Sequence, residues 1–372
     1  MMKLLPGILL LLIFNLLSGK RLIAQSWEMR FEALLDSVYQ ANEDALGILI
    51  HVESRDQHIS WTSARGFSDS SRTSQLTSNQ PVLLASNTKT YVSSATLKLV
   101  ELNKFTLDQS IKGLLTDGTQ SLLQEGGYSI EQITVRQLLS HTSGINDYVD
   151  KNYFELVINR PQYHWKKNEQ IQRALSKGPI SDPGQEFHYG DINYLLLTEI
   201  IEQQTQKPFY TAIRELLNYQ QYGLNSTWFI NLEEKPEHLA PMAHQYAQNF
   251  HLDSYAINPS WDLYGGGGMA ATVKDAAVFY NHLFEGKMIQ DEELLKEMYT
   301  YVLPAEKSKY CLGIYHFDFG YHLYYHGGWW GTDVNYCPET KTSVAVFTLV
   351  KEKQHTINPF LGKTIQGWIF DK

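Results

Sequence analysis

Cysteine is nearly absent from this sequence of 372 residues, in which only Cys311 and Cys337 occur. Two cysteines can form one disulfide in an oxidising compartment, but they cannot form the disulfide framework that stabilises small secreted domains. The 13 histidines form no His-Glu-x-x-His run, and only His322 and His326 are spaced four residues apart. The sequence therefore predicts no metal site.

Positive charge is also scarce, with 31 lysines and arginines against 40 acidic residues and a net charge of −9. The first 24 residues hold three basic and no acidic residues, so the rest of the chain is more acidic still. Nucleic-acid binding depends on lysine and arginine side chains that neutralise phosphates. We therefore expect no nucleic-acid partner, and the hydrophobic share of 43% is enough for a large core.

Long apolar runs are missing except for one at the N-terminus, over residues 4–17, which follows a single lysine. This run is short for a membrane span and is typical of a secretory signal. The sequence predicts a signal peptide over residues 1–24 and one domain over residues 25–372. We expect export to the periplasm or the cell exterior without a stable membrane span. An uncleaved N-terminal anchor is the alternative, because Lys20 and Arg21 follow the run.

Strand-like patterns lie at both ends of the chain, and a mainly helical stretch lies between them. A helical pattern precedes two strand-like runs separated by a polar turn, which predicts a hairpin. Residues 92–255 are mainly helical with long loops. The expected outer elements are a helix at 27–40, strands at 46–52, 58–64, 310–317, 321–325, 332–337 and 343–350, and a helix at 356–370. This order predicts an α/β sheet domain built from both chain ends, with an all-helical region inserted.

The segment at 82–90 combines a nucleophile with a candidate base. An apolar run ends at Ser86, and a helical pattern begins there, so we expect Ser86 in the first turn of an amphipathic helix. Lys89, three residues on, lies on the same helix face and can reach the Ser86 hydroxyl. A lysine desolvated in a cleft, with a lowered pKa, can take the serine proton. By itself the pattern also fits an ordinary serine N-cap beside a solvated lysine.

Three later motifs favour the catalytic interpretation. They are the helix with a polar stop at 133–144, the turn before a helix at 183–194, and the glycine-rich segment at 325–331. Together with 86–89, in this order, they resemble the serine β-lactamase and penicillin-binding-protein superfamily, in its class C-like branch. That branch includes class C β-lactamases, D-alanyl-D-alanine carboxypeptidases, D-aminopeptidases and esterases. The resemblance extends from about residue 44 to the C-terminus and implies an antiparallel sheet flanked by helices.

The resemblance implies a role for each motif residue. The family's Ser-x-x-Lys pair falls on Ser86 and Lys89. Its Tyr-x-Asn motif falls on Tyr189 and Asp191, where an aspartate replaces the asparagine. Its strand motif begins at His326, a histidine expected to titrate near its ordinary pKa of about 6.5 if it lines the site.

The remaining candidate site residues are expected to contact the substrate or to stabilise the oxyanion. Gly327 and Gly328 leave room for a substrate backbone along their strand. By resemblance, the backbone N–H groups of Ser86 and Trp329 form the oxyanion hole. For Asp191, a substrate contact and a cap on a helix beginning at Ile192 both remain open.

The sequence thus predicts an exported serine hydrolase that forms an acyl-enzyme on Ser86, with proton transfer by Lys89 and Tyr189. Its expected partner is a small-molecule or peptide substrate, including peptidoglycan, and it needs no cofactor. The substrates are D-amino-acid peptides, peptidoglycan-type amides or β-lactams. An esterase of the same family is the first alternative, and a catalytically silent binder of cell-wall peptide is the second.

Overall fold

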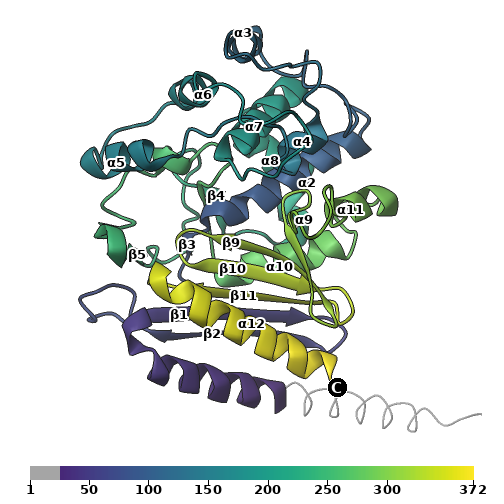
Figure 1. Cartoon of the computed structure of the whole chain (residues 1–372). Helices are drawn as coiled ribbons and strands as arrows, with labels where there is room; N and C mark the ends of the chain where they lie inside the picture. Colours follow the sequence, from purple (N-terminus) through teal and green to yellow (C-terminus); the bar gives the residue numbers. More distant parts are fainter. Residues whose placement is uncertain (1–25) are drawn as a thin grey trace, which may run out of the picture.

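The computed structural model describes residues 26–372, so the expected signal peptide lies outside the described residues. Its main sheet has six strands, all antiparallel, in the order β2-β1-β11-β10-β9-β8 (Figure 1). The strands are β1 (Gly47–Ser54), β2 (Ile59–Gly66), β8 (Tyr315–Asp318), β9 (His322–Gly328), β10 (Thr332–Cys337) and β11 (Thr342–Thr348). Because β1 pairs with β11, the two ends of the chain form one sheet, as the sequence predicts.

One face of this sheet is covered by the N-terminal helix at 26–41 and by α12 (Gln354–Phe370), which lie side by side in Figure 1. Alternate residues of β1 face these helices, since Ile48, Ile50 and Val52 belong to the same buried cluster as Phe31 and Leu361. Leu49 points to the opposite face and joins the larger core. β1 is therefore buried on both faces, which explains its nearly unbroken apolar run.

The helical region covers the other face, with α10 (Val273–Phe284) packed on β1, β10 and β11. The other helices are α2 (Thr88–Glu101), α3 (Asp117–Glu125), α4 (Val135–Leu139), α5 (Lys151–Asn159), α6 (Lys167–Leu175), α7 (Asp191–Thr205), α8 (Phe209–Leu216), α9 (Tyr219–Tyr222) and α11 (Glu292–Met298). α2 is buried on nearly every side rather than amphipathic, because α7 and α8 pack against it. It is the central helix of this region.

Two small sheets within the helical region were not predicted from the sequence. One has the order β3-β7-β4, formed by β3 (Val82–Leu83), β7 (Met269–Ala271) and β4 (Thr227–Phe229). The other pairs β5 (Tyr246–Ala247) with β6 (Leu252–Asp253). These strands have two or three residues each, too few for a period-two pattern to be recognised. The first sheet positions the segment before Ser86.

Several expected boundaries differ in the structure. The strand expected at 310–317 is formed only over Tyr315–Asp318, and the helix expected at 133–144 is reduced to Val135–Leu139. Cys311 and Cys337 are both buried and unpaired. Among residues 26–372, no helix is both long and apolar enough to cross a membrane.

Hydrogen bonds fasten the Ser86 segment to the sheet. The hydroxyl of Thr332, at the start of β10, donates to the Leu84 carbonyl at 2.8 Å. The amide of Asn87 donates to the Thr332 carbonyl at 3.1 Å and to its hydroxyl at 3.0 Å. All of these contacts are buried, so one threonine joins the turn that carries Ser86 to the start of β10 in the main sheet.

Replacing Thr332 by valine keeps its shape but removes the hydroxyl. We expect Thr332→Val to lower the free energy of unfolding by about 1–3 kcal/mol, because the Leu84 carbonyl and the Asn87 amide each lose a buried partner. Urea unfolding measures this change, with Thr106→Val, at an exposed position, as the matched control. Equal stability of the two variants would show that the hydrogen bonds of the Thr332 hydroxyl do not stabilise the fold.

Candidate active site

Ser86 lies in a short 3-10 turn (Ala85–Asn87) between β3 and α2, and thus just before the helix rather than in its first turn. Ala85 has a φ of 47°, in the left-handed region that a non-glycine residue seldom adopts. Such strain is found where surrounding structure forces a functional residue into position. Here the β3 pairing and the Thr332 contacts hold both ends of the turn, so Ser86 is fixed and partly exposed.

Lys89 is completely buried, and its ammonium makes two hydrogen bonds and one ion pair. Nζ lies 3.0 Å from Ser86 Oγ, 2.6 Å from the Gly266 carbonyl and 2.5 Å from Asp191 Oδ1. Burial lowers the pKa of Lys89, but the charges of Asp191 and of the neighbouring Tyr189 and Asp262 together outweigh burial and raise the pKa above its ordinary value. The predicted contact with Ser86 is present, while the predicted lowering of the Lys89 pKa is wrong.

Tyr189 lies beside both of these residues and lines the open side of the site. Its ring is 4.9 Å from Lys89 Nζ, and 38% of the residue is exposed. Burial raises the pKa of its phenol, and the charge of Lys89 and the hydrogen bonds with Lys89 and Ser86 only partly offset this. Tyr189 is therefore a neutral phenol in the resting site, placed to relay a proton.

His326 belongs to the same cluster but is only 2% exposed. Its Nδ1 is 2.8 Å from the Gly327 carbonyl and its Nε2 is 3.2 Å from the Tyr310 hydroxyl. Burial, and then the charge of Lys89, lower the pKa of His326 to about 3. The expectation that His326 titrates near neutral pH is therefore wrong, and the imidazole is a neutral hydrogen-bonding group.

Gly327 and Gly328 are required by close protein contacts. A Cβ on Gly328 would lie 2.1 Å from the Leu84 carbonyl oxygen, and one on Gly327 would lie 2.4 Å from the Tyr325 hydroxyl. Within the part of the chain that the structure describes, the strand also has a free edge here, since β8 pairs with β9 only as far as Tyr325. The glycines thus bring β9 against the Ser86 turn, and residues 326–328 keep an unpaired edge, with Trp329 in the following turn.

Asp191 does not act as a helix cap. It is the first residue of α7, and the N–H of Ile192 donates instead to Asp147 Oδ1 at 3.1 Å. The carboxylate of Asp191 forms an ion pair with Lys89 instead. At the position of Asp191 the family pattern has an asparagine. Of the two possibilities that the sequence left open, the cap is excluded.

Two further acidic residues, Asp147 and Asp262, lie close to Asp191. Neither was identified from the sequence. A Cβ on Gly266 would lie 2.8 Å from both Asp191 Cγ and Asp262 Oδ1, which shows how close the two carboxyls are. Desolvation, and then the charge of Asp191, raise the pKa of Asp147 to about 7 and also raise that of Asp262. In the sequence, the four glycines at 265–268 are the feature that lies next to Asp262, and no motif includes Asp147.

His141 has a structural role. Its Nδ1 accepts a hydrogen bond from the Gly190 N–H at 3.2 Å, and its ring centroid is 4.3 Å from that of Tyr189. His141 thereby orients the segment that carries Tyr189 and Asp191, without contacting Ser86.

Comparison with known proteins fits this geometry. The family model described as Beta-lactamase matches residues 30–356. The chain belongs to the Beta-lactamase family. It is a serine hydrolase of that family, with Ser86 and Lys89 in the Ser-x-x-Lys positions.

Individual relatives are distant. Penicillin-binding protein 4* of Bacillus subtilis is 27% identical over 134 residues, which are 35% of this chain and 29% of the relative. The match therefore spans less than a third of that protein's length. Among solved structures, a D-stereospecific amidohydrolase from Streptomyces superimposes with a TM-score of 0.69 at 23% identity, over 85% of this chain and 94% of that one. A D-amino acid amidase from Ochrobactrum anthropi gives 0.71 at 20%, over 86% and 91%.

The arrangement of this family member can move a proton away from Ser86. Asp191 forms an ion pair with Lys89 across 2.5 Å and favours the charged form of the lysine in the resting site. Once Lys89 has given up a proton, its neutral amine lies 3.0 Å from Ser86 Oγ and is able to take the hydroxyl proton during attack.

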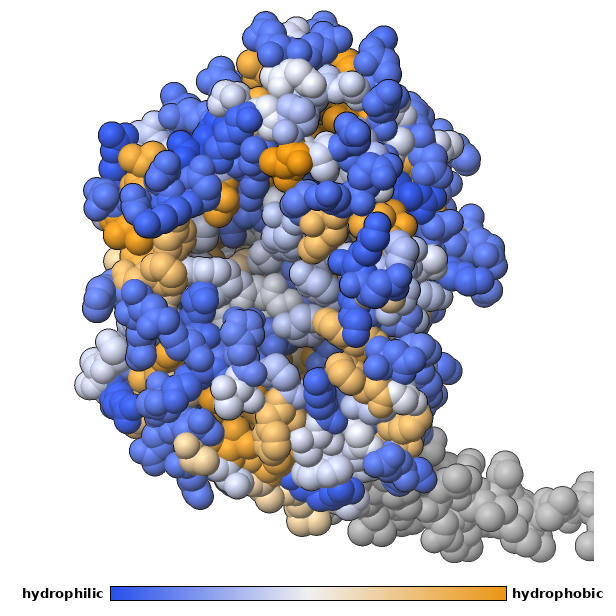
Figure 2. Space-filling view, in the orientation of Figure 1, coloured by the Kyte–Doolittle hydropathy of each residue, from blue (hydrophilic) through white to orange (hydrophobic). Residues whose placement is uncertain are grey.

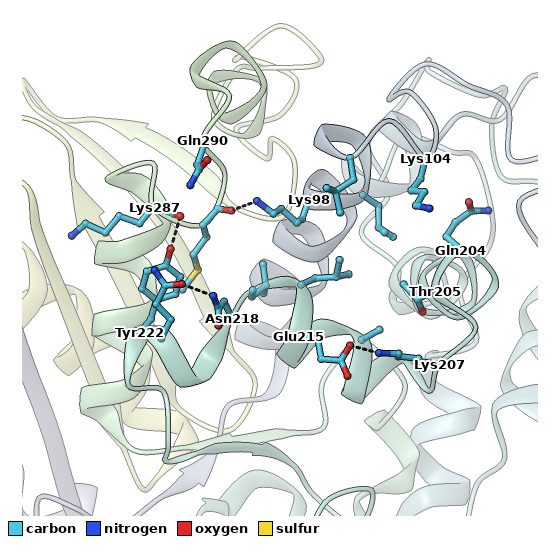
Figure 3. Close-up of a pocket in the computed structure, with 17 residues that line it drawn as sticks. Lys98, Lys104, Gln204, Thr205, Lys207, Glu215, Asn218, Tyr222, Lys287 and Gln290 are labelled. Carbon is cyan, nitrogen blue, oxygen red and sulfur yellow. Dashed lines mark hydrogen bonds and ion pairs between the residues drawn. The ribbon is translucent and has the colours of Figure 1, made fainter.

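The surface is hollowed between the helical region and the sheet (Figure 2). A separate cavity of about 610 Å³ lies at the other end of α2 and is lined by Lys98, Lys104, Lys207 and Lys287 (Figure 3). Lys207 pairs with Glu215, and Lys98 pairs with Glu101 and donates to the Met288 carbonyl. Its charges are thus largely paired, and its lining includes none of Ser86, Lys89 and Tyr189.

Replacing Asp191 by asparagine tests its control of Lys89. Without the carboxylate the pKa of Lys89 falls, so the free amine exists at lower pH. We expect the rising limb of kcat/KM against pH for an activated ester to move down by about one unit or more. Asp108→Asn, at an exposed ion pair with Arg136, is the control. A limb that stays in place would show that Asp191 does not govern Lys89.

Substitution of His326 tests whether its titration affects catalysis. We expect His326→Gln to lower kcat/KM about tenfold, since the contact with Tyr310 is disturbed, without moving any midpoint between pH 5 and 8. Asp147→Asn should instead remove a midpoint near its pKa of about 7. The measurement is kcat/KM across this range for the wild type and both variants. Loss of a midpoint in His326→Gln alone would mean that this histidine titrates in the site.

Proposed function

We propose that this chain is an exported amidase that forms an acyl-enzyme on Ser86 and acts on D-amino-acid amides and peptides, including peptidoglycan-type peptides. The observation that carries the proposal is the Lys89–Ser86 hydrogen bond of 3.0 Å, beside the unpaired edge of β9. An extended peptide can lie along such an edge, with its carbonyl carbon presented to the serine. The fold shared with the Streptomyces amidohydrolase and the Ochrobactrum amidase supports the substrate class.

The proposed reaction has two stages. In the first, Ser86 Oγ bonds to the carbonyl carbon and the carbon–nitrogen bond breaks. The serine proton passes through Lys89 and Tyr189 to the leaving amine. In the second, water attacks the ester, gives up a proton through the same groups and releases the acid while Ser86 regains its proton. The N–H groups of Ser86 and Trp329 stabilise the oxyanion in both stages.

Asp191 makes β-lactams a poorer substrate class for this chain than neutral amides. An asparagine at this position can donate a hydrogen bond to a substrate carbonyl, whereas an ionised carboxylate can only accept one. β-Lactams also carry a carboxylate of their own, and the neutral His326 supplies no positive charge to meet it. Amides without that carboxylate avoid the second penalty.

Export is part of the proposal and is supported by the apolar run at residues 4–17 after a basic start. Expression of the whole chain in a bacterial host, with the N-terminus of the product determined by mass spectrometry, tests this. We expect cleavage near residue 24 and recovery outside the cytoplasm. An intact N-terminus on a membrane-bound product would favour an uncleaved anchor.

Labelling of Ser86 tests the enzyme assignment. We expect a fluorescent fluorophosphonate to label the wild type and to fail on Ser86→Ala, with hydrolysis of an activated ester reduced at least about a thousandfold. Lys89→Arg should be nearly as inactive, because arginine stays protonated and cannot take the serine proton. Hydrolysis of D-amino-acid p-nitroanilides, with the L-isomers as control, then tests the substrate class. Labelling without any turnover would identify a silent binder.

A further inference from the structure

Four aromatic rings gather beside the active site, from four separate segments of the chain. They are Phe154 on α5, Phe250 in a 3-10 turn (Gln248–Phe250), Trp261 in a second 3-10 turn (Pro259–Asp262) and Trp329 in the β9–β10 turn. The Trp329 ring centroid lies 5.4 Å from that of Phe154, 5.8 Å from Trp261 and 5.9 Å from Phe250. Phe154 and Phe250 are 4.9 Å apart. We refer to these four residues as the aromatic wall.

The aromatic wall is not simply part of the core. Phe250 is 38% exposed, and Phe154 and Trp329 are partly exposed, while Trp261 is buried behind them. In Figure 2 apolar surface lies over α5 and next to β5, along one border of the hollow between the helical region and the sheet. Partly exposed apolar side chains grouped at a cleft are typical of a binding surface.

The position of the wall relative to the nucleophile is fixed by the chain itself. Trp329 directly follows Gly328, which packs against the Leu84 carbonyl two residues before Ser86. Trp261 directly precedes Asp262, whose carboxyl approaches Asp191. Tyr153 on α5 donates to the Trp261 carbonyl at 2.9 Å and thereby fixes α5 to the same site. The rings therefore border the place where a substrate carbonyl would meet Ser86.

We propose that the aromatic wall binds an apolar, ring-bearing group of the substrate and selects for it over a small aliphatic group. This inference rests on the proposed function, because it assumes a substrate acylating Ser86. Among the described residues, only the Lys351 ammonium lies over one of these rings, 5.2 Å from the Trp329 centroid. The wall thus offers ring edges and faces rather than charges, which suits an aromatic group.

A purely structural role predicts a different result. If the four rings only packed the protein, truncating one would lower stability, or lower the rates for all substrates equally. If they bind substrate, truncation lowers kcat/KM for a ring-bearing substrate and leaves a small one nearly unchanged. The ratio of the two values of kcat/KM therefore separates the roles.

The test compares p-nitrophenyl phenylacetate with p-nitrophenyl acetate, which share a leaving group and differ by one phenyl ring. We expect the wild type to prefer the phenylacetate by about tenfold or more, and Phe250→Ala and Phe154→Ala each to remove most of that preference. Phe250→Tyr, which keeps a ring, should retain it. Phe360→Ala is the matched control, since Phe360 is 53% exposed on α12, which covers the opposite face of the sheet.

The outcomes distinguish this inference from the proposed function. An unchanged ratio in both alanine variants overturns the aromatic wall as a binding surface. A lost preference combined with no cleavage of D-amino-acid p-nitroanilides upholds the wall and overturns the amidase proposal. No cleavage of either ester by the wild type overturns both.

Discussion

The buried pair of Lys89 and Asp191 is the constraint on which the rest of the site depends. An ammonium with no exposure is tolerated only when a carboxylate and further acceptors surround it, because desolvation of a lone charge costs several kcal/mol. α2 supplies the lysine, α7 supplies the aspartate, and the glycine-rich loop supplies the Gly266 carbonyl. Removing either partner would leave a buried charge uncompensated, so these three segments are held together by the chemistry that they perform.

The aspartate also changes how protons are shared. With asparagine at this position, Lys89 would have a neutral neighbour, and burial would push its pKa down. With Asp191, the lysine has a charged neighbour that raises its pKa, and the charge of Asp191 also raises the pKa values of Asp147 and Asp262. An aspartate in place of the family's asparagine also removes an amide hydrogen-bond donor from the site. One residue therefore affects both the base and the range of substrates.

The sequence was sufficient for local features and for motif order. Period-two and helical patterns predicted the β1–β2 hairpin and α12, and the Ser-x-x-Lys spacing predicted the contact between Ser86 and Lys89. The pKa values of Lys89 and His326 were not predictable, because they depend on burial and on Asp191, which is distant in the sequence. The role of Gly328 was also hidden, since its neighbour Leu84 is far along the chain. Sequence patterns carry periodicity, whereas electrostatics and close contacts depend on which segments meet.

The division of the chain into two parts gives each part a distinct task. The sheet, built from both chain ends and packed on two helices, provides a rigid strand with one unpaired edge at His326–Gly328. The helical region, inserted between those ends, supplies Ser86, Lys89, Tyr189 and Asp191 together with three of the four aromatic residues. Because the Ser86 turn is bonded to Thr332 on the sheet, the two parts are fixed in relation to each other at the nucleophile. Variation in α5 and in the turn that carries Phe250 can therefore alter which substrate group fits, without displacing the groups that move protons.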